Sequence, residues 1–68
     1  MDEEALNRSL RKFLKTVGVT AQREIEIAIR KGITDGRLKG SETLPAKATI
    51  TLAGADLTLN IDGDIELE

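Results

Sequence analysis

Acidic side chains near the C-terminal end form the first group that could do chemistry. Together with the amide of Asn60, the four acids occupy every second position: Asn60, Asp62, Asp64, Glu66 and Glu68. At this spacing they line one face of an extended strand. A row of oxygens suits Ca²⁺ or Mg²⁺, but a straight strand separates its side chains, whereas a calcium loop curls its ligands around the ion. The pattern therefore favours the polar outer face of a strand, and we predict no metal site.

Groups that act in catalysis are few. The chain has no His and no Cys, so the usual general base, the thiolate nucleophile and the commonest transition-metal ligands are missing. It contains no phosphate-binding loop and no dinucleotide fingerprint. A carboxylate pair such as Asp62 and Asp64 could transfer protons, but 68 residues leave little room for a pocket that shifts their pKa values. We predict no enzymatic activity and no cofactor.

Basic side chains gather on the polar side of a predicted N-terminal helix: Arg8, Arg11, Lys12 and Lys15. This basic surface could meet phosphates or an acidic partner, and the simpler account is a solvated outer helix face. Readers of single-stranded RNA stack bases on aromatic side chains. The only aromatic residue, Phe13, lies on the apolar side of that helix, so RNA binding is disfavoured.

The segment from Phe13 to Lys31 also has features of a DNA-binding helix-turn-helix. Its second helix would offer four polar side chains to DNA: Gln22, Arg23, Arg30 and Lys31. Leu14 is bulky where such units place a small residue, and Glu24 is charged where they bury one. We therefore favour a plain helical hairpin, and keep a small DNA-binding or regulatory protein as the alternative.

Two helices must position these groups. The first, about residues 3–17, has an apolar stripe at helical spacing: Leu6, Leu10, Phe13, Leu14 and Val17. Gly18 is placed to end it as a C-cap, and Thr20 to begin a second helix over about residues 21–35, which Gly36 would end. The stripe of the second helix is Ile25, Ala28 and Ile29. Ile27 then faces away from this stripe, between Arg23 and Arg30.

A β-hairpin follows, with predicted strands over about residues 46–53 and 56–62. A two-residue type II′ turn at Gly54-Ala55 pairs Leu52 with Leu57, Ile50 with Leu59 and Ala48 with Ile61. Every apolar residue then faces an apolar one, and a slip of one residue would turn the whole set to water. The same register puts Pro45, which has no N–H, at a hydrogen-bonded pair, so pairing should begin at Ala46.

The end of the chain leaves two alternatives. The second strand continues towards Leu67, or Asp62-Gly63-Asp64 is a three-residue loop before a short third strand over residues 64–67. In either case the prediction is a single α+β domain over residues 1–68, with two N-terminal helices packed on one face of the hairpin. The predicted core joins both parts: Leu6, Leu10, Phe13, Leu14, Val17, Ile25, Ala28, Ile29, Ile50, Leu52, Leu57, Leu59 and Ile61.

Charge and hydropathy indicate where in the cell the protein is expected. The formal net charge is −2, with nine bases and three acids from Arg8 to Lys39 and six acids and one base from Gly40 to Glu68. No apolar run approaches the ~20 residues of a membrane span, and Met-Asp-Glu-Glu is acidic where a signal peptide is basic. We expect a cytoplasmic protein without a membrane segment.

Several segments resemble a family of short, uncharacterised bacterial proteins. They are Arg11-Lys12-Phe13-Leu14-Lys15, Val17-Gly18-Val19-Thr20, Gln22-Arg23-Glu24-Ile25-Glu26, Thr43-Leu44-Pro45-Ala46-Lys47 and Ile61-Asp62-Gly63. The resemblance extends over nearly the whole chain. It implies a small domain of unknown function, and it assigns no activity, substrate or catalytic residue.

A protein partner is the remaining expectation. A lone two-stranded hairpin has two open edges and is marginal in water, and Ile27 lies outside the main helical stripe with Arg23 and Arg30 beside it. A second copy of the chain is the simplest cover for an open edge, because two-fold pairing is the commonest oligomer. Shielding by Leu38 and Leu44 within one chain is an equal alternative. We expect a non-enzymatic protein-interaction module, with nucleic acid less favoured as a partner.

Overall fold

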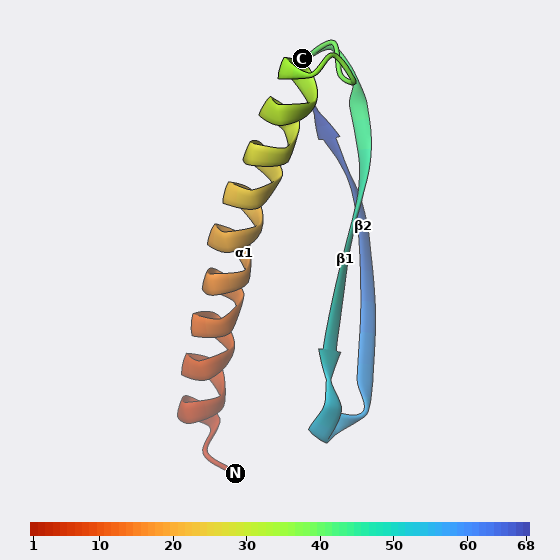
Figure 1. Ribbon diagram of the computed structural model, residues 1–68. Helices are drawn as coiled ribbons and strands as arrows, with labels where there is room; N and C mark the ends of the chain where they lie inside the picture. The colour runs from red at the N-terminus through yellow and green to blue at the C-terminus, as the bar shows by residue number, and fades with distance from the viewer. The chain divides into compact units, whose positions relative to one another are not determined.

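One helix and one hairpin make up the fold. The computed structural model describes residues 1–68 and contains α1 (Glu3–Thr34), β1 (Thr43–Leu52), a short 3-10 helix η1 (Ala53–Ala55) and β2 (Leu57–Glu66) (Figure 1). The chain divides into two units, Met1–Arg37 and Leu38–Glu68. The first holds α1 and the second holds the antiparallel pair of strands, so the fold class is α+β.

The prediction of two helices is wrong, because α1 runs unbroken through Gly18 for 32 residues. Only Gly36 and Gly40 among the glycines have positive φ angles, so Gly18 is not a C-cap. The physical reason is the apolar pattern, in which Leu14, Val17 and Ala21 continue one helical stripe across the predicted break. A single Gly inside a helix costs only about 1 kcal/mol relative to Ala, which is too little to stop a helix with this pattern.

Both ends of α1 are capped. The Asp2 carboxylate accepts hydrogen bonds from the backbone N–H groups of Glu4 at 3.0 Å and Ala5 at 3.1 Å. At the other end Gly36, with φ 82°, takes the left-handed conformation, and its N–H donates to the Ile33 carbonyl at 3.2 Å. Gly36 thus ends the helix, as predicted for the second helix.

The predicted hairpin register is confirmed. Leu52 pairs with Leu57, Ile50 with Leu59 and Ala48 with Ile61. The strands are longer than predicted, ten residues each, and they add the pairs Ala46 with Gly63 and Leu44 with Ile65. β2 passes through Gly63 without a loop, so the second strand continues and no third strand forms.

The turn differs from the predicted type II′ loop. Ala53–Ala55 form the 3-10 turn η1, and Asp56 closes it in the left-handed conformation with φ 53° and ψ 42°, its N–H donating to the Ala53 carbonyl at 3.2 Å. Gly54 has no positive φ. Asp is one of the few residues other than Gly that tolerate this conformation, so the special backbone position lies two residues later than predicted.

This longer turn explains why Pro45 lies inside β1. Residues directly opposite in an antiparallel pair alternate between hydrogen-bonded and non-hydrogen-bonded pairs. At the open end of the hairpin the N–H of Leu67 donates to the carbonyl of Glu42 at 2.9 Å, which makes that pair hydrogen-bonded. Counting inward, Pro45 and Asp64 form a non-hydrogen-bonded pair, so the missing N–H costs no ladder bond. The prediction that pairing begins at Ala46 is therefore wrong.

Neither unit buries an apolar side chain within itself. Val17, Ile29 and Ile50 are half-buried and the rest of the predicted core is exposed, with Phe13 at 52% and Leu52 at 53%. A single amphipathic helix or a two-stranded sheet has one apolar side and no second layer of its own to cover it. α1 lacks the long apolar stretch that a membrane-crossing helix requires.

Candidate functional site

The broadest candidate surface is one side of the hairpin. Because strand side chains alternate between two faces, the register gathers ten residues without a charge on one side, here called the apolar face: Leu44, Ala46, Ala48, Ile50, Leu52, Leu57, Leu59, Ile61, Gly63 and Ile65. Near the turn these side chains are well exposed, with Leu57 at 44% and Ile61 at 50%. An apolar face of this extent is suited to contact with another protein surface.

The opposite side of the hairpin is polar and carries most of the predicted acidic row. Asn60, Asp62, Asp64 and Glu66 lie on β2, and Glu68 follows the strand. Thr49 Oγ1 lies 2.8 Å from Asn60 Oδ1, and the hydroxyl donates across the strands. No group of three carboxylates comes together as a metal site. The acids therefore give this side negative charge without forming a chelating cluster.

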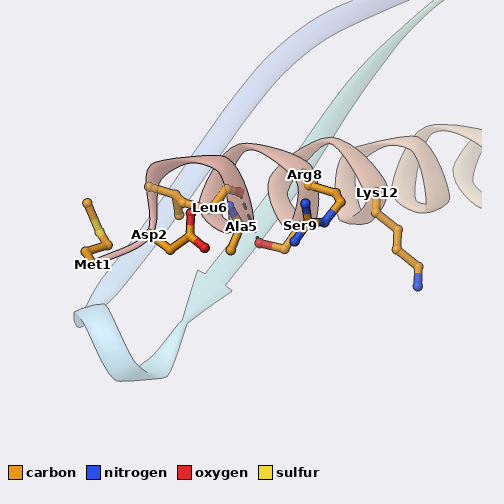
Figure 2. Close-up of a pocket in the computed structure, with 7 residues that line it drawn as sticks. All are labelled: Met1, Asp2, Ala5, Leu6, Arg8, Ser9 and Lys12. Carbon is orange, nitrogen blue, oxygen red and sulfur yellow. Dashed lines mark hydrogen bonds between the residues drawn. The ribbon is translucent and has the colours of Figure 1, made fainter.

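The predicted basic surface lies on the first half of α1. Arg8, Arg11, Lys12 and Lys15 are all exposed. Arg8 and Lys12 also border a shallow hollow at the start of the helix, which is lined by Met1, Asp2, Ala5, Leu6, Arg8, Ser9 and Lys12 (Figure 2).

Within this hollow the other polar groups are already engaged. The Asp2 carboxylate caps the helix, and the Ser9 hydroxyl donates to the Leu6 carbonyl at 3.0 Å. In Figure 2 Lys12 extends away from the remaining side chains. The hollow is formed by the first turns of one helix and the two residues before it, so it offers two cations on an open surface and no enclosed pocket.

The three predicted interface residues occupy one side of α1. Arg23, Ile27 and Arg30 follow one another at spacings of four and three, which places them on the same side of a helix. Ile27 is 55% exposed, and it lies away from the stripe that contains Ile25 and Ala28. Ile27 is therefore an exposed apolar side chain between two cations.

The helix-turn-helix hypothesis loses its geometric basis. That motif needs a turn between two helices that cross at a large angle, whereas α1 is continuous through Gly18 and Thr20. Its polar residues Gln22 and Arg23 are therefore mid-helix positions, and Gln22 donates from its side chain to the Glu26 carboxylate one turn later at 3.2 Å.

Sequence reasoning missed one engaged carboxylate, that of Glu42 in the connector between the units. It accepts hydrogen bonds from the backbone N–H groups of Lys39, Gly40 and Ser41 at 2.9 to 3.1 Å. The N–H of Lys39 is the largest influence that lowers the pKa of Glu42. Desolvation opposes it, and the N–H groups of Gly40, Glu42 and Ser41 lower the pKa further. The signal in the sequence was Gly-Ser before an acid, a composition typical of a turn.

A second carboxylate is paired at the end of α1. Arg37 Nε lies 3.0 Å from Asp35 Oδ1, and the hydrogen bond from Arg37 lowers the pKa of Asp35. Both side chains are largely exposed, so the pair contributes little to stability. Glu42 and Asp35 therefore shape the connector and leave no free acid for proton transfer there.

Comparison with known proteins places the chain in a family without assigning it an activity. The model of one family, described as a family of unknown function (DUF6494), matches residues 1–68. Neither a search of curated proteins nor a search of solved structures found a match. The match includes the apolar face, the basic surface and the connector, and on this evidence the chain belongs to the DUF6494 family of unknown function.

Proposed function

We propose that this chain is a non-enzymatic protein-interaction module that binds its partner through the apolar face of the hairpin. One observation carries the proposal: ten consecutive positions of that face are uncharged and apolar or glycine, while no apolar side chain of the chain is buried. Burial of apolar surface is the main driving force of protein association. A partner that covers this face would therefore stabilise both the complex and the hairpin.

The side of α1 that carries Arg23, Ile27 and Arg30 is a second contact in this proposal. An exposed isoleucine between two arginines combines an apolar anchor with cations that would recognise acidic groups on a partner. A second copy of the chain is the simplest partner for the module. The polar side of the hairpin, with its acids, would then remain in water.

Affinity capture from the native cell tests the proposal. The wild type would be compared with a variant that carries Ile50→Thr and Leu59→Thr, a cross-strand pair on the apolar face. Threonine keeps the strand preference while removing apolar surface. The matched control carries Thr51→Ser and Thr58→Ser, a cross-strand pair on the polar side. We expect the wild type and the control to retain the same identified proteins and the apolar-face variant to lose them.

Equal capture by all three proteins would contradict the proposal. So would binding of duplex DNA. A titration at ~50 mM salt gives DNA its best chance, because release of counterions favours association at low salt. Micromolar binding that weakens steeply with added salt, and that is lost on Arg23→Ala with Arg30→Ala, would favour a nucleic-acid function instead.

A further inference from the structure

One hydrogen bond shows which backbone N–H and C=O groups on the hairpin edges have no partner. Since Leu67 N–H donates to the Glu42 carbonyl at 2.9 Å, hydrogen-bonded pairs recur at every second position from there. The even-numbered residues of β1 therefore bond to β2, and the odd-numbered residues turn their N–H and C=O groups outward. Lys47, Thr49 and Thr51 thus present free donors and acceptors on the outer edge of β1, while Pro45 has no N–H to offer.

The outer edge of β2 is less suited to pairing with itself. Its outward residues are Thr58, Asn60, Asp62, Asp64 and Glu66. This edge carries three acids and no base, so pairing two copies of it brings like charges to one seam, and an axis at Asp62 sets two aspartates directly opposite each other, which destabilises a strand pair. The edge of β1 carries one charge, that of Lys47. Charge therefore selects β1 as the edge for a second copy.

We propose that a second copy of this chain adds to the outer edge of β1, antiparallel, with the two-fold axis at Thr49. This inference goes beyond the proposed function, because the second copy binds a strand edge and leaves the apolar face free for a partner. Thr49 then faces Thr49 of the second copy, and Lys47 faces Thr51 on either side of the axis. Each of these pairs exchanges two backbone hydrogen bonds, so the segment makes six. The result is a four-stranded sheet with the two β1 strands at its centre.

A two-fold axis at Lys47 or at Thr51 would give a less favourable strand pairing. An axis at Lys47 sets two lysines against each other and places Pro45 at a hydrogen-bonded position, where it cannot donate. An axis at Thr51 sets Thr49 against Ala53, which lies in the 3-10 turn and cannot extend the ladder. Among the axes that pass through an outward residue, the axis at Thr49 avoids like charges and uses every free N–H from 47 to 51.

The apolar face supports the same register. With the axis at Thr49, Ala48 faces Ile50 of the second copy and Ala46 faces Leu52. Each large side chain meets a small one, so the apolar faces of the two hairpins join into one continuous surface without crowding at the seam. On the polar side the two Thr49 residues form a threonine pair, which is favourable across strands.

The acidic edges also explain why assembly would stop at two copies. Both outer edges of the four-stranded sheet are β2 edges that carry Asp62, Asp64 and Glu66. Charged side chains on an edge strand oppose the addition of further strands. The pairing is therefore closed by two-fold symmetry and does not continue into a fibre.

Proline substitution tests the edge directly. Thr51 and Thr58 are cross-strand partners on the same side of the hairpin, and both turn their N–H groups outward, Thr51 on the β1 edge and Thr58 on the β2 edge. Thr51→Pro removes two of the six donors while sparing the hairpin's own ladder, as Pro45 already does at an equivalent position. We expect the dissociation constant of the dimer to rise at least about 30-fold, and Thr58→Pro to leave it unchanged. Sedimentation over a concentration series measures both.

A cross-link provides a second readout that does not depend on proline. The chain has no cysteine, so an introduced one reports on a single position. In the proposed pair the two Thr49 Cα atoms lie about 5.5 Å apart, within the range for a disulfide. Thr49→Cys should therefore form a covalent dimer under mild oxidation. Its cross-strand partner on the other edge provides the control, and Asn60→Cys should stay uncross-linked.

Three results would overturn this inference. They are a wild type that remains monomeric at the highest soluble concentration, a dimer that Thr51→Pro does not weaken, and equal cross-linking of Thr49→Cys and Asn60→Cys. None of them contradicts the proposed function, because a different protein could still cover the apolar face. Loss of capture on Ile50→Thr with Leu59→Thr, seen together with a monomeric wild type, would show a foreign partner and no second copy.

Discussion

At the residue scale, the most engaged polar group of the chain is structural. Glu42 uses its carboxylate to hold three successive backbone N–H groups of the connector, and Gly40 supplies the positive φ of 100° that this turn requires. A carboxylate bound in this way keeps the loop closed only while it is ionised. The role of Glu42 is therefore to order the connector, and the loop should open in acid.

The pH dependence of Glu42 has a definite sign. Because folding lowers its pKa, its contribution is present above the pKa of the unfolded state and is lost as the pH falls through the lower, folded value. We expect the amide signal of Gly40 in NMR spectra to titrate with a midpoint below that of glutamate in the urea-unfolded chain. Glu42→Gln should abolish this titration. Equal midpoints in the folded and unfolded chain would show that the carboxylate is not held.

At the element scale, α1 contains one residue that lowers the stability of the helix. Gly18 lies in the middle of the helix, and a Cβ atom added there would meet nothing within 4 Å. Gly18→Ala should therefore stabilise the chain by about 1 kcal/mol, measured by urea unfolding followed by circular dichroism. Gly36→Ala is the control and should destabilise it, because its φ of 82° is strained for alanine. A destabilising Gly18→Ala would indicate either a helix break or a close partner surface at this point.

The same elements show what sequence could and could not predict. The register was predictable because side chains alternate strictly along a strand, so the apolar residues from Ala48 to Ile61 allow only one pairing. The turn was not, because Gly54 suits a two-residue loop while Asp56 can also take the left-handed position. The helix break at Gly18 was misjudged for a related reason. The glycine lowers helix stability by only about 1 kcal/mol, and the apolar stripe that continues on both sides of it outweighs this cost.

Some features of the candidate surfaces could be predicted from the sequence and others could not. The outward position of Ile27 follows from helical spacing alone and was predicted. The role of Glu42 depends on the path of the connector, which no periodicity encodes. Two open edges were predicted, but the residues that turn their N–H groups outward were not, since that set depends on turn length. A four-residue turn in place of a two-residue turn reverses which pairs are hydrogen-bonded, and so it exchanges the inward and outward residues of the strand.

At the scale of the whole molecule, each of the two units has apolar surface without a core of its own. The 68 residues of the chain bury no apolar side chain, and it has no disulfide and no cluster of metal-binding side chains. Domains of this size need such support or oligomerisation to be stable. Association with a second copy is thus expected to contribute much of the folding free energy, and the stability of the chain should depend on its concentration.

Thermal unfolding tests this dependence. For a dimer of 68-residue chains that unfolds to two free chains, a hundredfold increase in concentration should raise Tm by roughly 10 °C, given the typical unfolding entropy per residue. Calorimetry at both concentrations measures the shift. Thr51→Pro should melt lower and with a much smaller dependence on concentration, because its dimer is weakened while the hairpin ladder is intact. A wild type with a high Tm that does not change with concentration would show that a single chain covers its own apolar surfaces, and that association adds nothing to its stability.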